Sequence, residues 1–233
     1  MKTVEGLALF CAVAVLVALL GLPSGSAAQG SIGPYCGLSE FKDADVQEGR
    51  CLHQLSQLAN RKGTGLVLHL DGGALKTIKS NPKACANDNA KDCVRSYLVG
   101  YHAGASLFII LRNCYEGWDY LLVSARNGAE TILGDQPHFA PDRSTFVIVD
   151  SQEEYQQDYL FALGTVATNP PSITWKNQGG DIAGEWEFQR WIDKDHVGVV
   201  LATQTPDCPN PKCEGLLSRE GKEWKLELLP AKK

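Results

Sequence analysis

The pattern of apolar and polar positions along the chain changes near residue 65. In residues 46–60, apolar side chains recur every three or four positions, which predicts a helix with one apolar face. Asp45 and Glu48 form a capping-box pattern at its start, and Gly63 follows as a stop signal. From Gly65 onward, short runs of branched and aromatic residues are separated by Gly, Asn, Asp and Pro. This pattern is typical of strands joined by turns, so the helix is expected to be an N-terminal addition to a β domain.

The predicted strands fall into groups. A hairpin is expected over residues 66–79, and three units of about four short strands follow at a spacing of roughly 45–50 residues. These units span residues 95–133, 138–175 and 186–229. The pattern predicts a mainly β fold, namely a propeller-like array of about three four-stranded units with one N-terminal helix. A two-sheet β-sandwich is the alternative, because propellers typically need about four blades to close.

Residues 118–149 carry the most regular part of this pattern. A strand beginning at Trp118 leads to a turn that ends at Gly128, and a second strand follows. The sequence Phe-Ala-Pro-Asp at positions 139–142 then precedes a further strand. This arrangement resembles a repeat of the TolB-type (WD-like) β-propeller family, with Arg143 where that family usually has glycine. The resemblance implies a propeller-like array that binds proteins or ligands on its loop surfaces.

The start of the chain has the layout of an export signal. A positively charged beginning, an apolar run over residues 7–22 and the small residues Ser26 and Ala28 predict a cleavable secretory signal peptide over residues 1–28. Cleavage after Ala27 is an alternative. The mature protein is therefore expected to be secreted or periplasmic, without stable membrane insertion.

Cleavage at this site defines the remaining organisation of the chain. Residues 29–64 are expected to form an N-terminal helical segment, and residues 65–233 a β-rich propeller-like domain. Removing residues 1–28 takes away one lysine and one glutamate, so the formal net charge stays at −5. Such an acidic balance argues against nucleic acid as a partner. The partner is then an unknown protein or a small ligand.

Seven of the eight cysteines follow the predicted signal peptide. In an exported chain, disulfides are the default expectation. The spacings also lack a tight C-x2-C pair, which makes zinc a weaker interpretation. Because seven is odd, proximity in the sequence predicts three bridges and one free thiol. The expected pairs are Cys36 with Cys51, Cys85 with Cys93 and Cys208 with Cys213, which leaves Cys114 free.

Familiar catalytic and cofactor motifs are not found in the sequence. There is no G-x-S-x-G elbow, no H-E-x-x-H motif and no phosphate loop, so no cofactor is expected. His69 and Asp71 form an H-x-D pattern that is better explained as the polar face of a hairpin. His138 and His196 lie beside predicted turns and are expected to be solvated. The five tryptophans fit strand cores better than a sugar-binding platform.

Acidic residues beside two tryptophans leave a hydrolase open as an alternative. Two carboxylates across a groove are the usual machinery of glycoside cleavage. The candidates flank Trp186 and follow Trp191, and they are Glu185, Glu187, Asp193 and Asp195. The leading expectation is an exported binding or protein-interaction module that is not an enzyme. The alternatives are a carboxylate-based hydrolase of carbohydrate or peptide, and a covalent dimer or redox protein that acts through Cys114.

Overall fold

The computed structural model describes six stretches of the chain, all within the compact unit Ile32–Lys233. These stretches are residues 35–36, 44–115, 117–149, 159–177, 184–202 and 213–229. The predicted signal peptide lies outside them. Among the described residues, no helix is long and apolar enough to cross a membrane.

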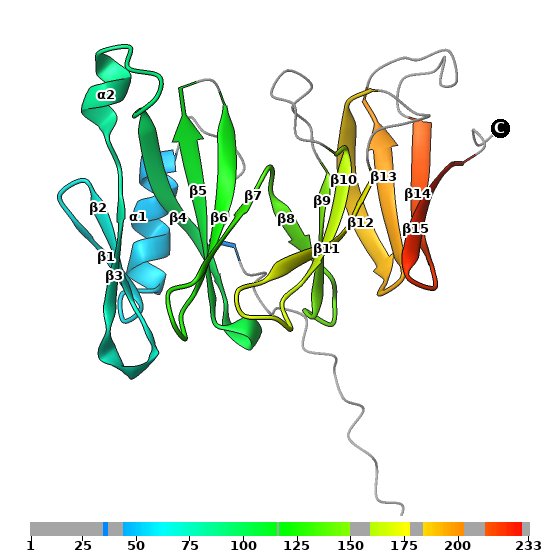
Figure 1. Ribbon diagram of the computed structural model, residues 1–233, viewed down its shortest axis with the longest axis horizontal. Coiled ribbons are helices and arrows are strands. Elements are labelled where there is room, and N and C mark those ends of the chain that lie inside the picture. Colours follow the sequence, from blue (N-terminus) through cyan, green and yellow to red (C-terminus); the bar gives the residue numbers. More distant parts are fainter. Residues whose placement is uncertain are drawn as a thin grey trace, which may run out of the picture. The chain divides into compact units, whose positions relative to one another are not determined.

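The described strands form four separate antiparallel sheets (Figure 1). Each sheet is built from strands that are consecutive in the chain. The first sheet has three strands, β1 (Ala59–Lys62), β2 (Gly65–His69) and β3 (Leu75–Lys79). The second has four, β4 (Val94–His102), β5 (Leu107–Cys114), β6 (Trp118–Ser124) and β7 (Glu130–Leu133).

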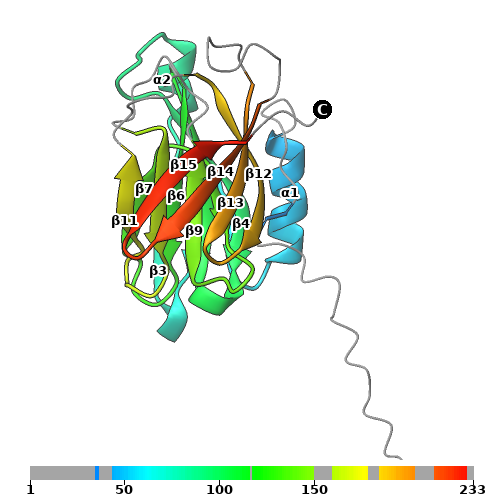
Figure 2. The same ribbon diagram turned by 90° about the vertical axis from the view of Figure 1, so that its right-hand side faces the viewer.

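The third and fourth sheets each have four strands. The third has the spatial order β11-β10-β9-β8, with β8 (Pro137–Phe139), β9 (Thr145–Val149), β10 (Phe161–Thr165) and β11 (Ser172–Asn177). The fourth follows chain order, with β12 (Trp186–Asp193), β13 (His196–Leu201), β14 (Cys213–Glu220) and β15 (Glu223–Leu228). Figure 2 shows β13, β14 and β15 lying side by side.

Within the described stretches, helical structure is confined to short segments. The α-helices there are α1 (Ala44–Gln54) and α2 (Pro82–Ala86), and 3-10 turns cover Asp71–Gly73 and Ala103–Ala105. Helix α1 buries Ala44, Glu48 and Cys51, so its buried face is only partly apolar and differs from the expected stripe, most of which lies beyond the end of the helix.

The predicted fold class is confirmed, and the three predicted units coincide with the second, third and fourth sheets. The helix prediction was too long, since α1 ends at Gln54 and residues 59–62 form strand β1. Gly63 is the reason. It has φ of 61°, in the left-handed region, and turns the chain back into β2 so that Lys62 lies opposite Gly65. Gly63 is therefore a hairpin residue and not a helix stop.

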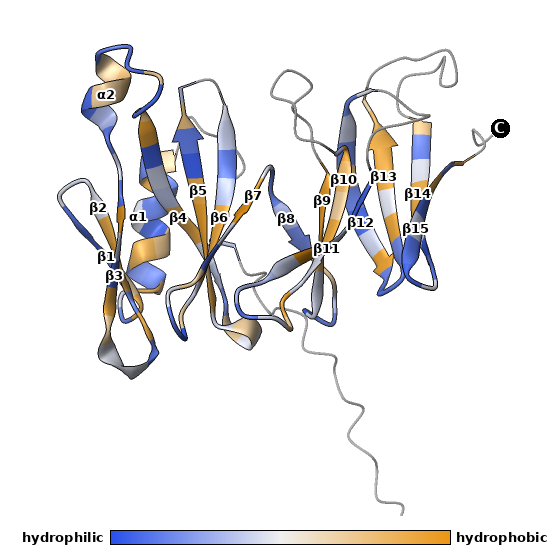
Figure 3. Ribbon diagram, viewed as in Figure 1, coloured by the Kyte–Doolittle hydropathy of each residue, from blue (hydrophilic) through white to orange (hydrophobic). Residues whose placement is uncertain are grey.

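Three apolar clusters join successive sheets. One lies between the first sheet, α1 and the second sheet, another between the second and third sheets, and the last between the third and fourth sheets. Strands of the middle sheets are buried on both faces, which explains their continuous apolar runs. Strand β9 is an example, with Phe146 to Val149 all buried and hydrophobic (Figure 3).

The turn between β8 and β9 is built as the sequence suggested. Arg143 donates its backbone N–H to the Ala140 carbonyl at 2.8 Å, and the Asp142 carboxylate accepts the Ser144 N–H at 2.9 Å. Arg143 has φ of 59°, a conformation that glycine adopts more readily than arginine. This position is the one where the TolB-type pattern has glycine.

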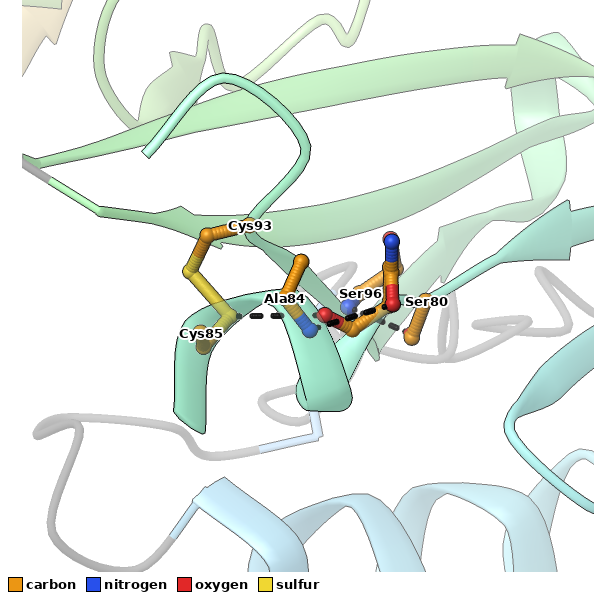
Figure 4. Close-up of a disulfide and its surroundings, with 6 residues drawn as sticks. Ser80, Ala84, Cys85, Cys93 and Ser96 are labelled. Carbon is orange, nitrogen blue, oxygen red and sulfur yellow. Dashed lines mark hydrogen bonds between the residues drawn. A yellow bond between two sulfur atoms is a disulfide. The ribbon is translucent and has the colours of Figure 1, made fainter. Parts of the chain in front are cut away.

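Disulfides fix the two helical segments. Cys36 is bonded to Cys51 of α1, and Cys85 is bonded to Cys93 across the loop that contains α2 (Figure 4). Both pairs match those predicted from proximity. Cys213 is also disulfide-bonded, whereas Cys208 lies outside the described residues. These bonds fit an extracytoplasmic protein.

Candidate ligand-binding cavity

A cavity of about 420 Å³ lies where the third and fourth sheets meet. Strands β9, β10 and β11 supply one wall, and the two hairpin turns of the fourth sheet supply the other. The polar and aromatic side chains in its lining are Thr145, Thr165, Thr174, Trp175, Lys194, Arg219, Lys222 and Trp224. We call this space the tryptophan cavity.

Both indoles in the lining are held in place by neighbouring groups. Trp175 of β11 donates its indole N–H to the Glu223 carboxylate at 3.2 Å, which links the third sheet to the fourth. Trp224 of β15 packs edge-on against Trp191, with ring centroids 6.3 Å apart. Trp191 in turn donates its indole N–H to the His138 carbonyl at 2.9 Å. The two cavity indoles are therefore oriented before any ligand arrives.

Three cationic side chains reach the cavity from the turns of the fourth sheet. Lys194 lies in the β12–β13 turn, Arg219 near the end of β14, and Lys222 in the β14–β15 turn. Asp195 lies 3.6 Å from both the Lys194 ammonium and the Arg219 guanidinium. Lys222 has no hydrogen bond or ion pair to any other described residue. The cavity therefore keeps an unpaired positive charge.

Asp142 is an acid that interacts with one of the cavity cations. Hydrogen bonds from Ser144 hold the pKa of Asp142 below its ordinary value, and the charge of Lys194 acts in the same direction. Asp142 itself belongs to the β8–β9 turn, where both of its oxygens bond Ser144. This carboxylate is thus occupied by its own turn, and none of the described lining residues is acidic.

The threonines of the lining differ in their hydrogen bonding. Thr165 donates to the Ser144 carbonyl at 3.3 Å, and Thr174 donates to the Leu163 carbonyl at 3.3 Å. The Thr145 hydroxyl oxygen is buried and has no hydrogen-bond partner among the described residues. Unpaired buried hydroxyls are uncommon in native structures, so the fold leaves one hydrogen-bonding group unused beside the cavity.

A second cavity, of about 490 Å³, lies between α1, β1 and β4, and it is built around a structural ion pair. The Arg61 guanidinium donates to both oxygens of Glu48, at 2.7 and 2.8 Å, and also to the Ser96 carbonyl. Glu48 also accepts the Leu98 backbone N–H at 2.7 Å. Glu48 and Arg61 are therefore satisfied by the fold, whereas Arg95 and the buried Ser96 hydroxyl have no side-chain partner among the described residues. The tryptophan cavity is the better candidate for a ligand site because, of the two cavities, it alone has indoles in its lining.

The four carboxylates of the hydrolase hypothesis are not brought together. Glu187 pairs with Val200 and Asp193 pairs with His196, so the two acids occupy opposite ends of the β12–β13 hairpin. Six residues of strand separate them by about 20 Å, more than the 5–10 Å that glycoside cleavage uses. Glu185 precedes β12, at the same end as Glu187.

The acids of the β12–β13 turn are also occupied. Asp193 accepts the Asp195 N–H and lies 2.8 Å from a ring nitrogen of His196. These contacts, with the backbone bond from Asp195 the largest, keep the pKa of Asp193 below its ordinary value. Trp186 is fully buried between the third and fourth sheets, in agreement with a core role.

The H-x-D pattern in the first sheet forms no metal site with the described residues around it. His69 lies 3.0 Å from the Asn60 amide across the β1–β2 pair, and Asp71 belongs to a 3-10 turn. In the described stretches, no group of three or more His, Cys, Asp or Glu side chains is placed to hold a metal.

Cys114 is a half-buried free thiol at the end of β5. Burial raises the pKa of the Cys114 thiol, and the neighbouring Asp119 adds to that effect. A raised pKa reduces the thiolate fraction at neutral pH and hence the reactivity of the sulfur. The surroundings therefore do not favour a redox role for Cys114.

His138 is not solvated, contrary to the expectation from its position beside a turn. Its ring stacks on Phe188 of the fourth sheet, with centroids 3.8 Å apart and an interplanar angle of 9°. Burial lowers the pKa of His138 to about 4. The contact forms because the third and fourth sheets pack face to face, which a local turn pattern cannot reveal.

This buried ring predicts acid sensitivity. A histidine with a folded pKa near 4 and an unfolded pKa of about 6.5 stabilises the native state only while it is neutral. We expect the free energy of unfolding to fall as pH decreases from 6.5 to 4, by up to about 3 kcal/mol from this residue. His138→Phe keeps the stacked ring and should flatten this part of the profile in urea unfolding. The exposed His53→Gln serves as the control, and equal pH slopes for both variants would contradict the assignment.

Sequence reasoning missed the tryptophan cavity itself. Trp175 and Trp224 do pack against the apolar cluster between the third and fourth sheets, as expected, but their place in the cavity lining was not predicted, and the turn cations carried no motif. Alternation along β15 does place Trp224 and Lys225 on opposite faces, but it does not say that the Trp224 face meets β11.

No protein-family model, curated protein or solved structure significantly matches this chain. The resemblance of residues 118–149 to a TolB-type repeat therefore stays a prediction.

Proposed function

We propose that this protein is an exported binding module that works in the secreted or periplasmic space and takes its ligand in the tryptophan cavity. The observation that carries the proposal is the convergence of two oriented indoles, the unpaired Lys222 and the partnerless Thr145 hydroxyl in one cavity. A concave, partly apolar site with a few polar groups is the usual form of a small-ligand site.

Location outside the cytoplasm has separate support. Two disulfides join described residues, and such bonds persist in oxidising compartments. The signal-peptide pattern of residues 1–28 points to the same compartment. The protein-interaction form of this function would use the same surface, since a protruding side chain of a partner can fill such a cavity.

The indole N–H signals of the five tryptophans provide a direct test. A ¹⁵N-labelled protein would be screened by NMR against neutral and acidic sugars, amino acids, short peptides and nucleotides at millimolar concentration. We expect at least one compound class to shift the signals of Trp175 and Trp224, because both rings line the cavity. The signals of Trp118 and Trp186, which lie elsewhere, should stay in place.

Single Trp→Phe variants assign the signals. A screen in which no compound moves Trp175 or Trp224 would remove the cavity as a small-ligand site. Shifts of equal size at Trp118 and Trp186 would indicate unspecific binding and count against the proposal as well.

A further inference from the structure

We propose that the ligand of the tryptophan cavity is an acidic saccharide, a sugar ring that carries a carboxylate or a sulfate. This inference rests on the proposed binding function and adds the ligand class to it. Three features of the cavity carry it, namely the indole faces, the charge of the lining and the free hydroxyl.

The indoles favour a sugar ring. The indole N–H of Trp175, its only polar group, donates to Glu223, so Trp175 can contact a ligand only through its apolar ring surface. An aromatic face is electron-rich and packs well against the C–H bonds of a sugar ring. Since Trp224 is held by Trp191, the cavity offers two such surfaces in fixed orientations.

The charge of the lining favours an acidic ligand. The chain as a whole has a formal net charge of −5, yet the described lining contains three cations and no acid. Asp195 lies at 3.6 Å from two of these cations and offsets part of their charge, and Glu223 at the rim is bonded to Trp175. Lys222 remains unpaired, and a carboxylate or sulfate is the group that pairs with it.

The Thr145 hydroxyl favours a ligand with hydroxyl groups. It is buried beside the cavity, can donate one hydrogen bond and accept others, and has no partner among the described residues. The volume of about 420 Å³ is at the lower end of the range for small-molecule sites. A compact sugar fills such a space, whereas an extended acidic peptide would run along β11, the outer strand of its sheet among the described strands.

Four probes separate these possibilities in calorimetric titrations of the full protein. They are trigalacturonate, its methyl-esterified neutral form, a sulfated chondroitin disaccharide and the peptide triglutamate. We expect trigalacturonate or the sulfated sugar to bind, and the better of the two identifies the charged group. The neutral ester should bind at least about tenfold more weakly than the acid. Added salt should lower the affinity of the protein for the acidic sugar.

Matched lysine variants test the site. Lys222→Met should lower the affinity for the acidic sugar about tenfold. Lys225→Met should leave it within about twofold, since Lys225 pairs with Glu220 on the opposite face of β15. Thr145→Val, which keeps the side-chain shape, should also weaken binding.

Several results would overturn the inference. Equal affinity for the ester and the acid would show that the ligand need not be acidic. Binding of triglutamate alone would show that the ligand is a peptide and not a saccharide. Unchanged affinity of the Lys222→Met variant for the acidic sugar would show that the sugar binds at another site. If none of the four probes binds while the NMR screen shows another ligand at Trp175 and Trp224, the saccharide class fails and the binding function stands. If neither experiment shows binding, both fail.

Discussion

Replacing Glu48 by glutamine is expected to lower the free energy of unfolding by about 3–5 kcal/mol. The Glu48 side chain is only 7% exposed, and it joins α1, β1 and β4 through Arg61 and the Leu98 N–H. An amide in its place cannot accept both Arg61 bonds and the Leu98 bond, so a partly buried guanidinium loses its counter-charge. Urea unfolding followed by circular dichroism would measure the loss.

Glu130→Gln is the matched control for this substitution. Glu130 forms an ion pair with Lys76 at 2.8 Å, but its side chain is 43% exposed. Exposed pairs contribute about 0–1 kcal/mol, so this variant should unfold nearly as the parent does. A similar loss in both variants would show that burial of the Glu48 pair is not what matters. The double replacement of Glu48 and Arg61 by methionine should recover part of the stability, because no charge is left unpaired.

Gly164→Ala is the second substitution with a large expected effect. An added Cβ would lie 2.1 Å from Cζ of Phe146 and 2.6 Å from both of its Cε atoms. Phe146 is fully buried between the second and third sheets, opposite Gly164 in the β9–β10 pair. The ring has no free space to enter, so we expect a loss of about 3 kcal/mol or more from overpacking. Thermal and urea unfolding would both report it.

Gly198→Ala provides the comparison in another buried strand. Its added Cβ would first meet the Gln189 side-chain oxygen at 3.1 Å, the far end of a flexible chain that can move. We expect a change within about 1 kcal/mol. Phe146→Leu in the Gly164→Ala background should restore part of the stability. If Gly164→Ala alone were as stable as Gly198→Ala, the close packing of Phe146 on Gly164 would be contradicted.

Much of the sheet architecture could be predicted because turn residues punctuate it. Gly128, the Pro141-Asp142 pair and Gly221 lie at or beside hairpin turns, and the apolar runs between such turns became strands. Strand β1 was missed for a physical reason. Asn60, Arg61 and Lys62 have no strand pattern of their own, and the segment is ordered by pairing with β2 and by the bond from Arg61 to Glu48.

The candidate site could not be predicted in the same way. Its residues come from two sheets and two turns, and Thr145 and Trp224 are far apart in the chain. Local patterns report which face of a strand is apolar, but they do not report which two sheets bring those faces together. For the same reason, the four acids near Trp186 and Trp191 looked like a group in the sequence but lie at the two ends of one hairpin.

The strictly consecutive order of strands within each sheet has a consequence for how the chain reaches its native state. Among the described residues, every strand pairs only with strands of its own sheet, and the apolar clusters join sheets that are neighbours in the chain. Each sheet can therefore form from a short, continuous segment before later segments are present. A chain that leaves an export channel with its N-terminus first could form the first sheet and helix α1 early. Each later sheet would then pack against a sheet that has already formed.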